Sequence, residues 1–91
     1  MTSSLIVEQL RQLPEGPGVY LMKDAEGTIL YVGKAASLRH RVRSYFGTGK
    51  KLTPKLQRMV SRVAELDFFV TNSEQEALIL ELNLIKRYHP R

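Results

Sequence analysis

Cysteine and tryptophan are absent from this 91-residue chain, and it has no long apolar run. Without cysteine the chain forms neither disulfides nor thiolate metal sites, and its two histidines, His40 and His89, are too far apart for a zinc-binding pair. No segment approaches the ~20 apolar residues that cross a bilayer, and the N-terminus lacks the basic lead of a secretion signal. We therefore expect a single cytoplasmic domain, residues 1–91, with a modest core and no membrane contact.

Acidic residues are also missing between Glu26 and Glu65, so the positive charge of the chain is concentrated there. The net charge is +5, and nine of the fourteen cations lie in this segment: Lys34, Arg39, Arg41, Arg43, Lys50, Lys51, Lys55, Arg58 and Arg62. A surface of one sign concentrates polyanions, so the block favours nucleic acid as a partner. The alternative is a solvated face that only keeps the domain soluble.

Hydrophobic spacing and turn residues predict an α+β fold in which helices flank a small three-stranded antiparallel sheet. Thr53-Pro54 is typical of a helix start, and so is Ser73 with Glu76 three positions later, whose carboxylate can accept from the Ser73 amide. The predicted strands cover about 18–23, 28–33 and 66–71, and the predicted helices about 4–12, 37–46, 54–64 and 74–88.

The first two strands are predicted to form a hairpin that brings tyrosines together. A four-residue loop, Asp24–Gly27, would place Tyr20 opposite Tyr31 and Met22 opposite Ile29, so that both phenols share one face of the sheet. We expect this face to be available as a site, because the other face receives the apolar side chains of Val19, Leu21, Leu30 and Val32.

One carboxylate is out of place on the last helix. On a helical wheel, Glu81 lies within an apolar arc formed by Ala77, Leu78, Leu84, Ile85 and Tyr88. An ionised carboxylate left unpaired in apolar surroundings costs several kcal/mol, so Glu81 requires a partner. That partner is either a single hard divalent ion held mainly by water, or a cation of the chain such as Lys34 or Arg41.

The helix at about 37–46 is expected to aim one cation at the tyrosines. Arg41 leans inward beside the Leu38 and Tyr45 stripe, whereas Arg39 and Arg43 share another side. Ordinary structural explanations compete for the remaining residues. The tyrosines can be a simple cross-strand pair, Tyr45 can be half core, Lys34 can point to solvent and Gly33 can merely end a strand.

Taken together, the residues resemble the GIY-YIG nuclease superfamily, whose name records two strings that stand here as Gly18-Val19-Tyr20 and Tyr31-Val32-Gly33. The similarity extends over most of the chain from residue 13 onward, and it is greatest with the N-terminal domain of the bacterial UvrC excinuclease family. The segments that carry it are Leu13–Asp24, Tyr31–Ala35, Arg41–Phe46 and Glu76–Lys86.

The resemblance implies a small α+β domain that hydrolyses a DNA phosphodiester bond with one divalent cation, Mg²⁺ or Mn²⁺. It makes Glu81 the metal ligand and Tyr31 the group that activates or orients the attacking water. It places Arg41 and Lys34 beside the scissile phosphate, with Tyr20 and Tyr45 completing the hydrogen-bond network. A further active-site asparagine is expected beyond Arg91.

The resemblance also implies the biological context, which is the incision 3′ to a lesion in nucleotide excision repair. The expected partners are double-stranded DNA with a lesion and the damage-recognition and loading subunits of the excinuclease. The chain would be a monomeric N-terminal part of a longer multidomain protein. Cations expected on the DNA backbone are Arg39, Arg43, Lys50, Lys51, Lys55, Arg58 and Arg62. A non-catalytic basic binding module and a stand-alone GIY-YIG nuclease are the alternatives.

Two mechanisms stay open for Tyr31. Moving a phenol from a pKa of ~10 to ~7 requires about 4 kcal/mol, and one opposite charge within reach supplies roughly 1–3 pKa units. Lys34 and Arg41 together with a divalent ion would therefore suffice for a tyrosinate general base. The rival is a metal-bound hydroxide that Tyr31 only orients.

Overall fold

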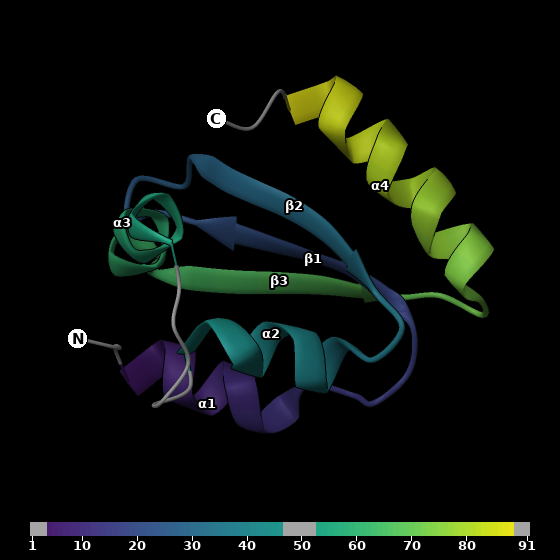
Figure 1. Ribbon diagram of the computed structural model, residues 1–91, viewed down its shortest axis with the longest axis horizontal. Coiled ribbons are helices and arrows are strands. Elements are labelled where there is room, and N and C mark those ends of the chain that lie inside the picture. The colour runs from purple at the N-terminus through teal and green to yellow at the C-terminus, as the bar shows by residue number, and fades with distance from the viewer. Residues whose placement is uncertain (1–3, 47–52, 89–91) are drawn as a thin grey trace.

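Figure 1 shows the computed structural model, which describes residues 4–46 and 53–88. It confirms the α+β class and each predicted element. The order is α1 (Ser4–Gln12), β1 (Gly18–Lys23), β2 (Ile29–Ala35), α2 (Leu38–Phe46), α3 (Pro54–Arg62), β3 (Glu65–Val70) and α4 (Glu74–Tyr88). Strand β2 runs two residues further than predicted and α3 ends two residues earlier. None of the described helices is long and apolar enough to cross a membrane.

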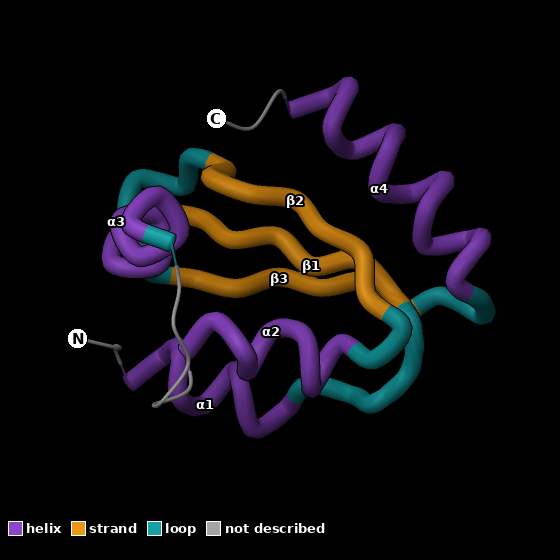
Figure 2. Tube along the Cα trace, viewed as in Figure 1, coloured by secondary structure: helices purple, strands orange, loops and turns teal. Residues whose placement is uncertain are grey.

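The sheet has the strand order β2-β1-β3, with both pairs antiparallel, so β1 is the central strand. Helices α1 and α2 lie together on one side of the sheet and α4 lies on the other, beside β2 (Figure 2). Helix α3 sits at the end of the sheet where the β1–β2 hairpin turns. The central strand is therefore covered on both faces, and each of its residues except Lys23 is buried.

Each face of the sheet carries its own apolar cluster. Under α4, Val19, Leu21 and Val32 pack against Ala77. On the opposite face the buried cluster comprises Ile6, Leu13, Tyr20, Met22, Ala35, Leu38, Val42 and Leu66. The tyrosine face, which the sequence predicts to be available as a site, is thus largely covered, because α1 and α2 pack on it and leave Tyr20 only 2% exposed. Tyr31 and Tyr45 on this face are half-buried.

The hairpin register differs from the predicted one. Tyr20 is opposite Gly33 and Met22 is opposite Tyr31, whereas Ile29 pairs with Lys23 across an irregularity between Met22 and Lys23. The predicted opposition of Tyr20 with Tyr31 and of Met22 with Ile29 is wrong. Because the slip is two residues, both phenols still share one face.

Local hydrogen bonds explain the slip. Asp24 Oδ1 accepts from the backbone N–H groups of Glu26 and Thr28, both at 2.9 Å, so the loop includes Thr28. Gly27 has a φ of 85°, which favours glycine. Leu30 follows at the irregularity, and it lines a cleft beside α3 instead of the cluster under α4.

The two predicted helix caps form, one of them with a changed partner. Thr53 Oγ1 accepts from the N–H of Leu56 at 3.2 Å, with Pro54 in the first turn. Ser73 Oγ accepts from the N–H of Glu76 at 3.1 Å. The Glu76 carboxylate, however, accepts from the amide of Asn72 rather than from that of Ser73.

Gly18 lies where β1, β3 and α2 approach one another closely. A Cβ at this position would lie 2.2 Å from the Phe69 carbonyl oxygen and 2.7 Å from Leu38 Cδ1. We expect Gly18→Ala to lower the free energy of unfolding by about 1–3 kcal/mol, because backbone must move to admit the methyl group. Gly16→Ala is the matched control, since nothing lies within 4 Å of the position that its Cβ would take. Urea denaturation measures both, and equal stabilities would contradict the prediction.

Candidate active site at the edge of strand β2

Three tyrosines from three elements meet on the α2 side of the sheet. The ring centroids of Tyr20 and Tyr31 are 5.9 Å apart, and Tyr45 of α2 lies 6.0 Å from Tyr20 and 6.2 Å from Tyr31. The hydroxyls of Tyr20 and Tyr45 are hydrogen-bonded at 3.0 Å. Tyr20 is buried, whereas Tyr31 and Tyr45 are half-buried and reach the surface. The structure thus brings together all three tyrosines that the sequence singled out.

Gly33 makes this cluster possible. A Cβ at Gly33 would lie 2.5 Å from both Cζ and the hydroxyl oxygen of Tyr20, and 2.8 Å from Cε2 of Tyr31. The Tyr20 ring therefore lies directly over the glycine of the neighbouring strand. The interpretation of Gly33 as a simple strand end is wrong, because β2 continues to Ala35.

Burial sets the acidity of the tyrosines. Burial, reinforced by the hydrogen bond to Tyr45, raises the pKa of Tyr20 above its ordinary value, and the charge of Arg41 opposes this shift. Burial also raises the pKa of Tyr31, with Tyr45 and the negative charge of Glu81 acting in the same direction. Both phenols are therefore protonated at neutral pH in the protein by itself.

Glu81 lies on the side of α4 that packs on the sheet. Ala77, Leu80 and Leu84 contact the cluster under α4, and Glu81 between them is half-buried. The predicted apolar arc is partly wrong, because its members Leu78, Ile85 and Tyr88 are 41%, 37% and 47% exposed. The packed face is narrower and includes Leu80, since the helix contacts mainly β2 and β1.

The Glu81 carboxylate has no cation partner among the residues that the structure describes. The predicted alternative of an ion pair with Lys34 or Arg41 is therefore not formed. Although Glu81 comes from the other layer, its negative charge acts on the phenol of Tyr31 and raises the pKa of that group. Residues 4–46 and 53–88 contain no group of three acidic, histidine or cysteine side chains that could hold a metal. A lone half-buried carboxylate fits a hard divalent ion whose other ligands are mainly water.

The two predicted catalytic cations lie on different faces. Lys34 is exposed, and it pairs with Val19, on the face that α4 covers. Arg41 is exposed on α2, so it is not part of the buried side of that helix. Its charge nevertheless lowers the pKa of Tyr20, which places the guanidinium near the tyrosine cluster.

Two other arginines of α2 have partners that the sequence did not indicate. Arg39 Nε donates to the Leu13 carbonyl at 2.9 Å, and its guanidinium lies 3.6 Å from a carboxylate oxygen of Glu15. Arg43 donates to the Leu10 carbonyl through Nε at 3.4 Å and Nη2 at 3.3 Å. These bonds hold the end of α1 against α2, which only the tertiary fold could show.

A cationic cleft lies beside α3. Lys55, Arg58 and Arg62 are exposed and line it together with Leu30 and Met59, around a volume of about 180 Å³. Arg62 also lies 3.8 Å from Asp24 of the hairpin loop. Lys50 and Lys51 fall outside the described residues.

The sheet order, the tyrosines packed on Gly33 and the single carboxylate of α4 define a GIY-YIG domain. The chain belongs to the family described as the UvrC-like GIY-YIG domain, which matches residues 16–91.

Relatives and solved structures agree with this family. UvrABC system protein C of Dehalococcoides mccartyi is 58% identical over 90 residues, which cover 99% of this chain and 15% of that protein. The protein of the same name from Syntrophomonas wolfei is 53% identical over 91 residues, again 15% of its length. The chain therefore spans about one seventh of the relatives that it matches.

A solved structure covers nearly the same residues. It is the GIY-YIG N-terminal endonuclease domain of UvrC from Thermotoga maritima, bound to its catalytic divalent cation, magnesium. It is 40% identical, with a TM-score of 0.85 over 98% of this chain and 96% of that one. Structures of that domain with a single tyrosine-to-phenylalanine or asparagine-to-alanine change also hold the cation.

The proximity of Glu81 to Tyr31 can be tested by titration. Because the negative charge of Glu81 raises the pKa of Tyr31, we expect Glu81→Gln to lower this pKa, while burial keeps it above the ordinary value. Carbon-13 NMR of labelled tyrosine, recorded without divalent ions, follows the titration. Glu74→Gln removes an exposed carboxylate from the same helix and should leave the Tyr31 pKa unchanged. An unaltered titration in Glu81→Gln would contradict the geometry.

Proposed function

We propose that this domain is a divalent-metal-dependent DNA endonuclease that hydrolyses one phosphodiester bond at the edge of β2. The observation that carries the proposal is a half-buried carboxylate, Glu81, that is unpaired among the described residues and whose charge acts on the phenol of Tyr31. Cations flank them from both layers, Lys34 from the α4 side and Arg41 from the α2 side. This arrangement exceeds the needs of a module that only binds nucleic acid.

Each group has a role that follows from its place. Glu81 would hold the Mg²⁺ or Mn²⁺ ion, which supplies positive charge beside the phosphate and makes bound water more acidic. In-line attack builds negative charge on the phosphate oxygens, and Arg41 and Lys34 offset it. Tyr20 and Tyr45 are positioning residues, because their packing and mutual hydrogen bond hold the ring of Tyr31.

We favour the mechanism in which Tyr31 orients the attacking water over the one in which it acts as a general base. Its pKa is raised by burial, Tyr45 and Glu81, which is opposite to the shift that a tyrosinate base needs. A tyrosinate would therefore require more than the about 4 kcal/mol that separates a pKa of ~10 from ~7. A neutral phenol aligns the attacking water through its hydroxyl without that cost.

DNA would be held by its backbone. Lys55, Arg58 and Arg62 form an exposed cationic cleft, and Arg39 and Arg43 add charge on α2, although both are tied to α1. Lys50 and Lys51 are assigned to the same surface from the sequence alone. Contacts to phosphates carry no base readout, so we expect binding that is indifferent to sequence and weakened by salt.

The biological role is proposed from the relatives. Their name, UvrABC system protein C, supports the incision 3′ to a lesion in nucleotide excision repair of cytoplasmic DNA. We propose that the domain acts as a monomer, and that damage recognition and loading come from the other excinuclease subunits.

Removal of the metal-holding carboxylate tests the activity. We expect Glu81→Ala to abolish Mg²⁺-dependent cleavage of DNA, by at least about a hundredfold in rate, while DNA binding stays within about twofold of wild type. A gel assay of nicking and fluorescence anisotropy measure the two quantities. Glu74→Ala is the control on the same helix. Cleavage retained by Glu81→Ala would refute the ligand assignment. A protein extended past Arg91 to include the expected asparagine that binds DNA but never cuts it would favour the non-catalytic module.

The pH dependence of the cleavage rate distinguishes a Tyr31 that orients water from a Tyr31 that acts as a general base. If Tyr31 only orients water, Tyr31→Phe lowers the rate by about ten- to a thousandfold but keeps the shape of the pH–rate profile. Single-turnover rates between about pH 6 and pH 10 provide the profile. Loss of a titration limb in Tyr31→Phe would restore the tyrosinate mechanism.

A further inference from the structure

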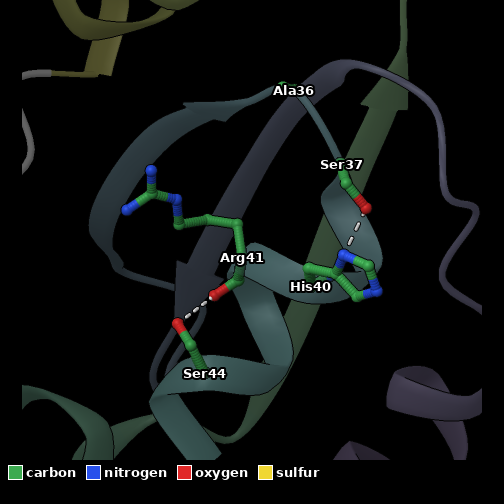
Figure 3. A pocket seen from close by; sticks show the side chains of 5 residues that line it. All are labelled: Ala36, Ser37, His40, Arg41 and Ser44. Atoms are coloured by element: carbon green, nitrogen blue, oxygen red, sulfur yellow. Dashed lines mark hydrogen bonds between the residues drawn. The ribbon is translucent and has the colours of Figure 1, made fainter.

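An open hollow lies at the N-terminal end of α2, directly after β2. It has a volume of about 330 Å³ and is lined by Ala36, Ser37, His40, Arg41 and Ser44. Figure 3 shows that the side chains of His40 and Arg41 point to different sides of this hollow. None of the five lining residues is acidic.

Arg41 is the one arginine of α2 without a partner among the described residues. Arg39 and Arg43 donate to carbonyls at the end of α1, and Arg39 also faces Glu15. Arg41 takes part in no ion pair or side-chain hydrogen bond within residues 4–46 and 53–88. A cation that the protein does not neutralise, in a hollow without carboxylates, suits an anion.

Two further donors line the hollow on the side away from the Arg41 guanidinium (Figure 3). Ser37 Oγ accepts from the N–H of His40 at 3.4 Å, so its own hydroxyl proton is available to a ligand. The exposed imidazole of His40 offers a ring N–H. Ser44, by contrast, already donates to the Arg41 carbonyl at 2.6 Å. The hollow therefore presents a hydroxyl and an imidazole on one side, which suit the oxygens of one phosphodiester, and a guanidinium on the other side.

The position of the hollow relates it to the reaction. Its first residues follow β2, the strand that carries Tyr31 and Lys34, and Arg41 acts on the tyrosine cluster from the same helix. A DNA strand whose scissile phosphate lies at Tyr31 and Glu81 would pass Arg41 toward the hollow.

We propose that this hollow binds the backbone phosphate of a nucleotide adjoining the scissile bond, with Ser37 and His40 as positioning residues. The proposal rests on the proposed endonuclease function. It adds to that function a second phosphate site. By holding this neighbouring phosphate, the site fixes which phosphodiester bond of the strand lies at Tyr31 and Glu81. Arg41 then contacts the scissile phosphate, and Ser37 and His40 contact the neighbouring one.

Phosphate interference tests the contact directly. DNA duplexes with a single neutral methylphosphonate, moved one position at a time around the cleaved bond, are bound to the 91-residue chain in EDTA and followed by anisotropy. We expect one flanking position to weaken wild-type binding by about tenfold, as loss of charged hydrogen bonds does. In His40→Ala the same methylphosphonate should cost no more than about twofold, because the contact is already missing.

Variants at Ser37 supply the matched control. Asn and Asp both serve as helix N-caps, so Ser37→Asn and Ser37→Asp preserve α2, but only the second brings a negative charge into the hollow. We expect Ser37→Asp to raise the Kd for DNA by about tenfold and Ser37→Asn by about twofold or less. Ser73→Asp places the same charge at the N-cap of α4 and should leave the Kd unchanged.

Kinetics separate this site from the reacting groups. In Mg²⁺, His40→Ala should raise KM severalfold with kcat within about twofold, and His40→Lys should restore KM. Methylphosphonate effects that stay the same in His40→Ala, or equal losses in Ser37→Asp and Ser73→Asp, would overturn the proposal even if the wild-type chain cuts DNA. If the coupled interference is present but a protein extended past Arg91 to include the expected asparagine never cuts, the endonuclease function is refuted and the phosphate site is kept.

Discussion

The packing of the Tyr20 ring on the backbone of Gly33 is the constraint on which the rest of the structure depends. Tyr20 stands on the central strand, and its ring reaches across β2 because Gly33 has no Cβ to obstruct it. Its hydroxyl would be costly to bury alone, and Tyr45 of α2 satisfies it. One contact thus fixes the distance between the two strands, brings α2 against the sheet and sets the place of Tyr31.

The candidate site lies where two layers meet at an open edge. Among the described residues, strand β2 is paired only with β1, so its other edge is not covered by a further strand. Tyr31 and Arg41 reach this edge from the α2 layer, whereas Lys34 and Glu81 reach it from the α4 layer. At such an edge the reacting side chains are held by the packed layers, and they can still be reached by a substrate. Neither face of the sheet allows this by itself, because both faces are covered by helices.

The cations of the basic block divide into different tasks although they are adjacent in sequence. On α2, alternate arginines behave differently, since Arg39 and Arg43 bind carbonyls of α1 and its following loop while Arg41 stays unpaired among the described residues. On α3, Arg62 approaches Asp24 and thereby links the helix to the hairpin. The distribution of charge along the sequence predicts a surface that binds nucleic acid. It does not show which of the cations form hydrogen bonds or ion pairs within the domain.

By itself the sequence determined the element types, the helix caps, the three tyrosines, the unusual place of Glu81 and the family, because these follow from local spacing and from residue identity. Only the tertiary structure decided the hairpin register, the covering of the tyrosine face and the exposure of Arg41. Register depends on the Asp24 loop and the irregularity after Met22, and neither appears in the alternation of apolar residues. Which face a helix covers depends on contacts between residues far apart in the chain, as between Leu13 and Arg39. Such long-range contacts cannot be predicted from local sequence patterns, because the contacts contribute free energy only when the layers pack together.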